Sequence, residues 1–345
     1  MLGASSGIGR ATARAAARRG ANVVVAARNA PALDAAVLEI EAEGAAGIAV
    51  ATDTTSQAGL ESICARAVER FGRIDTFVAS VMVTVYAEVE QLDADELRRV
   101  MDVNFLGRAH AYKAALPHLK ATRGTFIDVN SGLAYRGIPL QAAYCASKAA
   151  GRAFFESART EQEKLDTGVD ISLILPGGIN TPQFDRGRQK LGLQPQPVPP
   201  IYQPEIVAEA ILHCCERPQR ELPVTWASQK LLWGQKLSPR AGDRVLLRNG
   251  WKGQTTGEAK PLDSPDNLYE TIAGDPGGHG RFDEQARSGS AWTEARLRLG
   301  KVGSIAALAA PVVAGVIGYH KVTEAALVPA CRCEKRSHKH WRSWN

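Results

Sequence analysis

Six short apolar segments recur through the first 225 residues, and each is followed by a stretch of helical composition. They span residues 21–27, 47–51, 75–80, 125–130, 170–175 and 222–226. These segments show little alternation of polar and apolar residues, which is typical of strands buried on both faces. Strands that alternate with helices in this way predict a parallel sheet covered by helices on both sides, a doubly wound α/β fold.

The composition fits a globular protein and leaves few other classes open. Of 345 residues, 45% are hydrophobic and 23% are charged, which argues against a disordered chain or a protein with many membrane spans. No secretory signal follows Met1, and six irregularly spaced cysteines do not suggest a disulfide framework, so we expect a cytoplasmic protein. The net charge of +6 raises nucleic acid or an anionic membrane as partners.

Most of that charge belongs to the end of the chain. Residues 321–345 contain six lysines and arginines and two glutamates, which gives +4 of the total +6. We therefore expect no nucleic-acid partner, since that hypothesis rests on charge alone.

A glycine-rich loop opens the chain. Gly3-x-x-x-Gly7-x-Gly9 precedes a helical stretch, and Ser5 and Ile8 lie within the same loop. Such glycines let the backbone turn sharply and approach a pyrophosphate, while the first turn of the helix offers free amide groups. Three glycines alone are a weak signal that an ordinary turn could explain, but their place in an α/β pattern favours a dinucleotide site.

The strand that should precede this loop is nearly absent. Only Met1 and Leu2 stand before Gly3, whereas a typical strand has about five or six residues. We expect the true start to lie upstream; a truncated or damaged copy and a strand supplied from elsewhere are the alternatives.

The end of the next strand predicts the choice of nucleotide. Where an acidic residue would bind the ribose hydroxyl of NAD, the chain has Ala27 and then Arg28. A guanidinium suits a 2′-phosphate, so we expect NADP(H), with NAD(H) less favoured; a solvated surface arginine is the alternative. Asp53 is placed to accept from the adenine amino group, or to cap the helix that follows.

The strongest catalytic signal is Tyr144-Cys-Ala-Ser-Lys148 with Ser131 upstream. Tyrosine and lysine four residues apart share one helical face, and the lysine ammonium should lower the phenol pKa from near 10. Tyr144 can then exchange a proton with a carbonyl or alcohol oxygen, and Ser131 can donate to the same oxygen. A surface helix pair is the alternative reading of the tyrosine and lysine.

Together these motifs resemble those of the classical short-chain dehydrogenase/reductase family over residues 1–228. The resemblance implies a Rossmann-like NADP-binding catalytic domain and an NADP(H)-dependent oxidoreductase acting on alcohol and carbonyl groups. It also implies that Asn104 holds a water linked to Lys148, and that Pro176, Gly177 and Thr181 line the nicotinamide. Tyr144 and Lys148 are expected to contact the cofactor as well.

The chain departs from the family pattern at two places. Leu2 replaces the usual threonine before the first glycine, and residues 79–82 replace Asn-Asn-Ala-Gly. The alternative function is therefore a non-catalytic or truncated nucleotide-binding relic, with a membrane tether as one form of it. Homo-oligomers are possible, and the substrate is unreadable because its pocket would come from variable segments: 80–89, 132–140 and the loop after Thr181.

Beyond residue 228 the pattern changes. We expect an extension over residues 229–300 that is first helical, over 228–248, and then loop-rich. Its segment 264–283 resembles an extension of some bacterial family members and is expected to pack over the domain.

The last part, 301–345, holds an apolar segment and the basic tail. Residues 302–319 are free of charge and near the minimum length for a membrane helix, so a membrane anchor and a helix docked on the protein are both open. Cys331 and Cys333 lie near two histidines, but their spacing matches no standard zinc pattern, and we predict no metal site.

Overall fold

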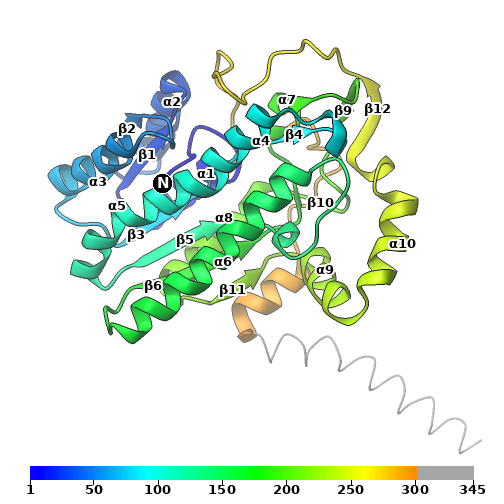
Figure 1. The fold of residues 1–345 in the computed structure, drawn as a ribbon. Helices are drawn as coiled ribbons and strands as arrows, with labels where there is room; N and C mark the ends of the chain where they lie inside the picture. Colours follow the sequence, from blue (N-terminus) through cyan, green and yellow to red (C-terminus); the bar gives the residue numbers. More distant parts are fainter. Residues whose placement is uncertain (301–345) are drawn as a thin grey trace, which may run out of the picture. The chain divides into compact units, whose positions relative to one another are not determined.

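A parallel sheet with helices on both faces forms the centre of the protein in a computed structural model that describes residues 1–300 (Figure 1). Two sets of strands make it up. The first pairs β1 (Val23–Ala27) with β2 (Gly47–Ala51), in register from Val23 opposite Gly47 to Ala27 opposite Ala51. The second has the order β11-β6-β5-β3, formed by Glu221–Pro223, Asp170–Leu175, Thr125–Val129 and Thr76–Ala79.

Leu2 joins these two sets in place of a full strand. It forms parallel bridges to Ala26 of β1 and to Ala79 of β3. Its amide donates to the Val78 carbonyl and its carbonyl accepts from the Ser80 amide, both at 2.9 Å. The expectation of a nearly absent first strand is therefore confirmed, and no other strand of residues 1–300 fills its place.

Met1 extends this bridge by one residue. Its ammonium donates to the Val24 carbonyl at 2.7 Å, and its own carbonyl accepts from the Ala26 amide at 2.9 Å. Because the ammonium is buried between the strands, its pKa is lowered to about 6.

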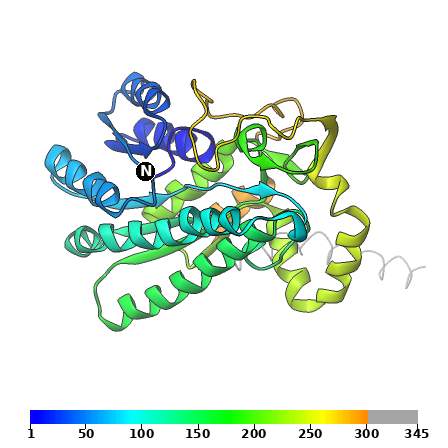
Figure 2. The same cartoon turned by 45° about the horizontal axis from the view of Figure 1, so that its top comes forward.

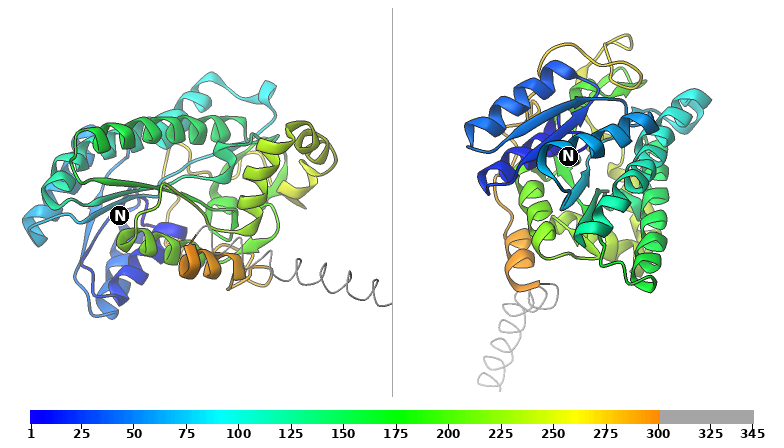
Figure 3. Two further views of the ribbon diagram at one scale, coloured as in Figure 1. Left: turned by 90° about the horizontal axis from the view of Figure 1, so that it is seen from below. Right: turned by 90° about the vertical axis from the view of Figure 1, so that its left-hand side faces the viewer.

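The two faces of the sheet are covered by different helices (Figure 3). The residues of α3 (Gln57–Phe71), α5 (Gly107–Thr122) and α6 (Ala142–Lys164) pack with Leu2, Phe77 and Phe126 on one face. On the other face, α1 (Gly7–Arg18) and α2 (Ala30–Ala42) cover β1, while α8 (Pro204–Glu216) covers β5 and β6. Alternate residues of each strand thus enter opposite core layers, which explains their near-continuous apolar sequences.

Shorter elements fill the connections around the carboxyl ends of the strands. They are β4 (Val85–Tyr86), η1 (Val89–Gln91), α4 (Ala94–Met101), the π-helical turn η2 (Asp102–Leu106), η3 (Gly132–Ala134), β7 (Gly178–Ile179), α7 (Gln183–Arg186), β8 (Arg188–Gln189), β9 (Leu193–Pro195) and β10 (Ile201–Tyr202).

The extension begins with two helices where the sequence suggested one continuous stretch. α9 (Trp226–Leu237) and α10 (Pro239–Asn249) are separated at Ser238, whose backbone is not helical. Pro239 lacks an amide hydrogen and disfavours helical geometry at the residue before it, so the first helix ends there.

The chain then returns across the molecule. After η4 (Lys252–Gln254), the strand β12 (Thr255–Ala259) pairs antiparallel with β9. Residues 260–283 cross the carboxyl ends of the strands as an irregular segment, drawn in gold in Figure 2. Trp292 is buried and donates to the Pro223 carbonyl, so residues 229–297 belong to the same compact unit as residues 1–228.

Two expectations concern the end of the chain. Among residues 1–300, no helix is long and apolar enough to cross a membrane, and no group of three metal-ligating side chains occurs. The apolar segment 302–319 and the pair Cys331 and Cys333 lie outside the described residues.

The bridge at Leu2 generates a stability prediction. Leu2→Asn keeps the side-chain size but places an amide in a site that is 1% exposed, so we expect a loss of about 3 kcal/mol or more in the free energy of unfolding. Leu38→Asn on the surface of α2, where the leucine is 67% exposed, is the matched control and should change stability by less than about 0.5 kcal/mol. Urea denaturation of both variants measures the difference; equal midpoints would show that the bridge contributes little.

Candidate active site

A cavity of about 520 Å³ lies at the carboxyl ends of the parallel strands. Its walls come from the glycine loop, the ends of β1, β3, β5 and β6, and the extension. This edge of an open α/β sheet is where such folds bind ligands, and the volume suits a small-molecule site. Every predicted site residue except Asn104 and Gly9 lines the cavity.

The glycine loop is shaped by its own packing. Gly3 has a φ of +84°, and a Cβ added to it would lie 2.7 Å from the Val81 amide nitrogen. A Cβ on Gly9 would overlap the Gly3 carbonyl oxygen. Glycine is thus required at both positions so that the loop can fold between Leu2 and the start of α1.

This loop leaves donors free for an anion. Ser5, Gly7 and Ile8 line the cavity at the start of α1, and no side chain caps this helix. The amides of Ile8 and Gly9 have no hydrogen-bond partner within residues 1–300. Free amides at the positive end of a helix dipole fit the phosphates of a dinucleotide.

Arg28 lies at the same end of the cavity, and it is not freely solvated. Its guanidinium is 23% exposed and donates to the carbonyl oxygens of Asn267 at 2.6 Å and Tyr269 at 2.7 Å. The alternative of a solvated surface arginine is therefore wrong, while its contact with a 2′-phosphate stays a prediction.

Asp53 also has defined partners. Arg99 donates to its carboxylate at 2.7 Å, and the Thr55 amide and hydroxyl donate at 2.9 Å. Partial burial works to raise the pKa of Asp53, but these hydrogen bonds outweigh it and hold the pKa below its ordinary value. The helix α3 is capped by Ser56, so the alternative of Asp53 as its N-cap is wrong.

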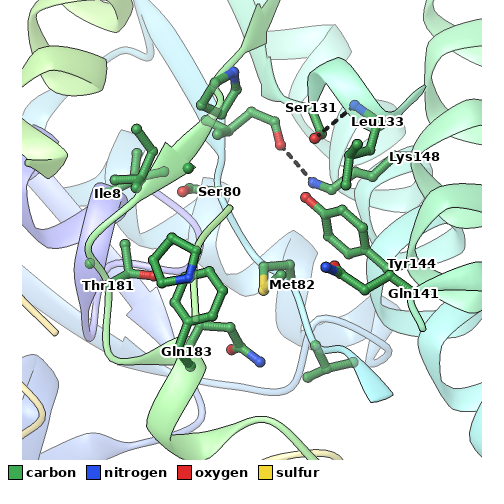
Figure 4. Close-up of a pocket in the computed structure, with 18 of the residues that line it drawn as sticks. Ile8, Ser80, Met82, Ser131, Leu133, Gln141, Tyr144, Lys148, Thr181 and Gln183 are labelled. Atoms are coloured by element: carbon green, nitrogen blue, oxygen red, sulfur yellow. Dashed lines mark hydrogen bonds between the residues drawn. The ribbon is translucent and has the colours of Figure 1, made fainter. Parts of the chain in front are cut away.

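Ser131, Tyr144 and Lys148 meet on one side of the cavity, opposite Ile8 and Thr181 (Figure 4). Ser131 follows β5 by two residues and is the N-cap of η3, where its hydroxyl accepts from the Leu133 amide at 3.1 Å. Tyr144 and Lys148 come from the first turns of α6, as their spacing predicts. Lys148 donates to the Val129 carbonyl at 2.8 Å, and its ammonium lies 5.5 Å from the centre of the Tyr144 ring.

The pKa of Tyr144 moves in the direction opposite to our expectation. Burial raises it to about 12, an effect that the neighbouring Ser131 hydroxyl only partly offsets. Burial and the nearby Arg108 charge lower the pKa of Lys148 well below its ordinary value. The expected lowering by the lysine ammonium is absent here because the low dielectric disfavours the charged form of both groups.

The side-chain amide of Asn104 is hydrogen-bonded to the backbone of Val83. Its side chain accepts from the Val83 amide and donates to the Val83 carbonyl, both at 2.8 Å, and it also donates to the Ser147 hydroxyl. It lies fully buried in the π-helical turn η2. Asn104 therefore braces the loop after β3, the segment where this chain lacks the Asn-Asn-Ala-Gly pattern.

A buried ion pair close to Lys148 escaped the sequence analysis. Arg108 donates to Asp128 at 2.6 Å, and both side chains are 0% exposed. Asn130 donates to the same carboxylate and to the Lys148 carbonyl, which ties the pair to α6. Asp128 could have signalled it, because a carboxylate inside a strand buried on both faces requires a cationic partner.

The segment after β6 forms the wall opposite Tyr144. Pro176, Gly177 and Thr181 line the cavity there, with Gln183 and Arg186 of α7. The Thr181 methyl carbon would lie 3.0 Å from a Cβ on Gly7, so this segment and the glycine loop are packed closely.

Comparison with known protein families agrees with this geometry. A family model described as short chain dehydrogenase matches residues 1–191, more than half of the chain. The chain belongs to the short-chain dehydrogenase family. This chain is 33% identical to uncharacterized oxidoreductase YxnA of Bacillus subtilis (strain 168) over 322 residues, which cover 92% of this chain and 88% of the relative.

Two solved structures of the family have a similar fold. An alcohol dehydrogenase from the archaeon Thermococcus sibiricus, complexed with 5-hydroxy-NADP, is 27% identical with a TM-score of 0.55. A short chain dehydrogenase from Mycobacterium paratuberculosis, bound to NAD, is 22% identical with a TM-score of 0.58. Each likeness covers 65% of this chain, and 92% and 94% of the respective solved chains. The Rossmann-like fold is thus shown, as is an oxidoreductase of this family.

The remaining end of the cavity lies beyond Tyr144 and is mostly apolar. It is lined by Met82, Leu133, Ile138, Val198, Leu231, Val245 and Leu246, together with the polar residues Gln141, Asn249 and Gln254, and none of these side chains is charged. The sequence analysis anticipated segments 80–89, 132–140 and the loop after Thr181. It missed α9 and α10, because an amphipathic helix pattern does not tell which surface its apolar face covers.

Proposed function

We propose that this family member is an NADP(H)-dependent oxidoreductase that interconverts an uncharged, largely apolar alcohol and its carbonyl compound. The observation that carries the proposal is one cavity that joins the free amides of the glycine loop to Ser131, Tyr144 and Lys148. A nicotinamide cofactor, when bound, supplies the hydride to the carbonyl carbon or accepts it back.

The residues of the chain handle the oxygen of the substrate. Ser131 donates a hydrogen bond to the carbonyl oxygen and stabilises the negative charge that develops there. Tyr144 then transfers its phenolic proton to the same oxygen, which completes the alcohol. Lys148 is held by the Val129 carbonyl between Tyr144 and the cofactor half of the cavity, and its ammonium would balance a phenolate.

Asn104 and Arg108 act through their neighbours. Asn104 fixes the loop at Val83, and Arg108 with Asp128 and Asn130 fixes the backbone of Lys148. Neither side chain lines the cavity, so we assign them to positioning. The role of Asn104 in holding a water, expected from the family resemblance, stays a proposal.

Arg28 supports the choice of NADP(H). Its guanidinium faces the cavity at the end of β1, and Arg99 partly neutralises the neighbouring Asp53 carboxylate. A 2′-phosphate there would meet the guanidinium groups of Arg28 and Arg99, with the Asp53 and Glu270 carboxylates also close to Arg28. Asp53 remains our candidate for the adenine amino group. The solved relatives bind 5-hydroxy-NADP in one case and NAD in the other, so Arg28 itself carries this part of the proposal.

The substrate class follows from the apolar end of the cavity. Without a charged side chain there, an ionised substrate would lose its hydration and gain no partner. A cytoplasmic location and assembly into homo-oligomers remain proposals that rest on the sequence. A non-catalytic relic is the alternative function, and it is distinguished by nucleotide binding without turnover.

Tyr144→Phe removes the proton donor and keeps the ring. We expect turnover of an apolar ketone with NADPH to fall by about 10² to 10⁴ while NADPH affinity changes little, since general acid catalysis contributes about this factor. Tyr112→Phe is the matched control, because this tyrosine lies in the core with a hydroxyl that has no partner. Steady-state kinetics and fluorescence titration measure both effects. Equal turnover of Tyr144→Phe and the unmodified protein would refute the assignment.

The raised pKa of Tyr144 predicts different pH profiles in the two directions. Reduction needs the neutral phenol, which persists up to a pKa of about 12, so its kcat should stay level from about pH 6 to 9. Oxidation needs the phenolate, whose fraction rises about tenfold per pH unit below the pKa. Initial rates in both directions test this. An oxidation plateau with an inflection near pH 7 would show that the pKa is lowered in the working complex.

Arg28→Ala tests the cofactor preference. Losing a charge-assisted contact should reduce kcat/KM for NADPH relative to NADH by about tenfold or more. The ratio is the informative quantity, because any general loosening of the site affects both nucleotides. Arg98→Ala on the exposed surface of α4 is the control. A ratio that does not change would mean that Arg28 does not read the 2′-phosphate.

A further inference from the structure

A segment of the extension crosses the nucleotide half of the cavity. We call residues 266–277 the strap; it lies within the gold segment of Figure 2. Asn267, Thr271, Ile272 and Pro276 of the strap line the same cavity as the glycine loop and Arg28. The strap therefore forms part of the wall of the proposed nucleotide site, although it is far from the motifs in sequence.

The strap is bonded to the elements that would hold the nucleotide. The Gly277 carbonyl accepts from the Gly7 amide at 3.2 Å. Arg28 donates to two strap carbonyls, and Asn29 donates to the carbonyls of Ile272 at 3.2 Å and Gly274 at 3.1 Å. These donors come from the glycine loop and the end of β1, which also line the proposed nucleotide site. Movement of the strap and binding of a nucleotide are therefore expected to affect one another.

An ion pair holds the strap to α1. Arg10 is 4% exposed and binds the carboxylates of Glu39 and Asp275 together. Partial burial works to raise the pKa of Asp275, but the hydrogen bond from Arg10 outweighs it and lowers that pKa. Asp275 is itself 41% exposed, so the anchor is reachable by mutation without disturbing the core.

Buried residues fix the chain on both sides of the strap's middle. Leu268 is 0% exposed among Val83, Val100 and Val103, and Phe282 is 3% exposed. Between them most residues from 269 to 279 are exposed or only partly buried, and Gly274 and Gly277 have positive φ angles of +85° and +69°. The middle can thus move while its ends stay in the core.

His279 adds a titratable contact just beyond the strap. Partial burial disfavours its charged form, but Glu205 and Asp283, each 2.9 Å from one ring nitrogen, raise its pKa above the ordinary value. The contact is stabilising at acidic pH and weakens as the pH rises through the raised pKa. The experiment below is therefore run at one fixed pH.

We propose that the strap is a component of the dinucleotide site, closing over the adenosine half and retaining the bound cofactor. The proposal rests on the nucleotide binding proposed above. Release of the cofactor then requires the strap to part from Arg10, Arg28 and Asn29. The ligand it retains is a dinucleotide, with either a 2′-hydroxyl or a 2′-phosphate on its ribose.

Asp275→Asn weakens the anchor at Arg10 and is the variant that tests this. Stopped-flow fluorescence should show NADPH and NADH leaving about fivefold or more faster than from the unmodified protein, as expected when a charge-assisted hydrogen bond is weakened. Glu43→Gln is the matched control: it removes a carboxylate that binds Arg14 and Arg18 of the same helix but does not touch the strap.

Hydrogen exchange gives a second, independent readout. Amides of residues 266–277 should exchange more slowly when NADPH is bound to the unmodified protein, and faster in Asp275→Asn without nucleotide. An unchanged release rate in Asp275→Asn, or an unchanged exchange of the strap on NADPH binding, overturns the proposal. A protein that binds neither nucleotide would instead overturn the proposed function, so the two failures are distinguishable.

Discussion

The bridge formed by Leu2 is the constraint on which the rest of the site depends. The strands β1 and β2 carry Arg28 and Asp53, whereas β3, β5 and β6 lead to Ser80, Ser131 and Pro176. Met1, Leu2 and Gly3 provide the backbone hydrogen bonds that join these two sets at the centre of the sheet. The nucleotide half and the catalytic half are thus aligned through very few residues, and the side chain of Leu2 must be fully packed for that alignment to hold.

The catalytic side depends on a second constraint, the burial of charge. Arg108 and Asp128 are fully enclosed and form an ion pair, and their charges act on Lys148 in opposite directions. Tyr144 and Lys148 are themselves buried, which raises the pKa of the Tyr144 phenol and lowers the pKa of the Lys148 ammonium. A neutral phenol is the form that donates a proton to a developing alkoxide, which is a stronger base than a phenolate even when the phenol pKa is about 12. The proposed reduction therefore does not require the lowered pKa that the helical spacing had suggested.

The strands, the main helices and the meeting of Ser131, Tyr144 and Lys148 were predictable from sequence, because apolar patterns report burial and helical spacing reports which side chains share a face. Partners across long separations were not. The contacts of Arg28 lie about 240 residues away, and the backbone that Asn104 braces is defined only by the folded loop at Val83. The apolar periodicity also did not reveal that the helical stretch breaks before Pro239. It could not show that the two resulting helices line the apolar end of the cavity.

The extension contributes to the lining of the cavity at both of its ends. α9 and α10 supply apolar residues beyond Tyr144, and the strap supplies backbone carbonyls over the glycine loop and Arg28. The likeness to the Bacillus subtilis relative covers 92% of this chain, more than residues 1–228 can account for, whereas the solved structures match only 65%. In the proposed function, the common family fold supplies the reacting groups, while the added segment restricts the shape of the substrate and covers the nucleotide. Arg28 follows β1 of the family fold and hydrogen-bonds to the strap of the extension. The Arg28 guanidinium donates to two strap carbonyls and has further N–H groups for the proposed 2′-phosphate, so cofactor choice and closure of the site are linked through one side chain.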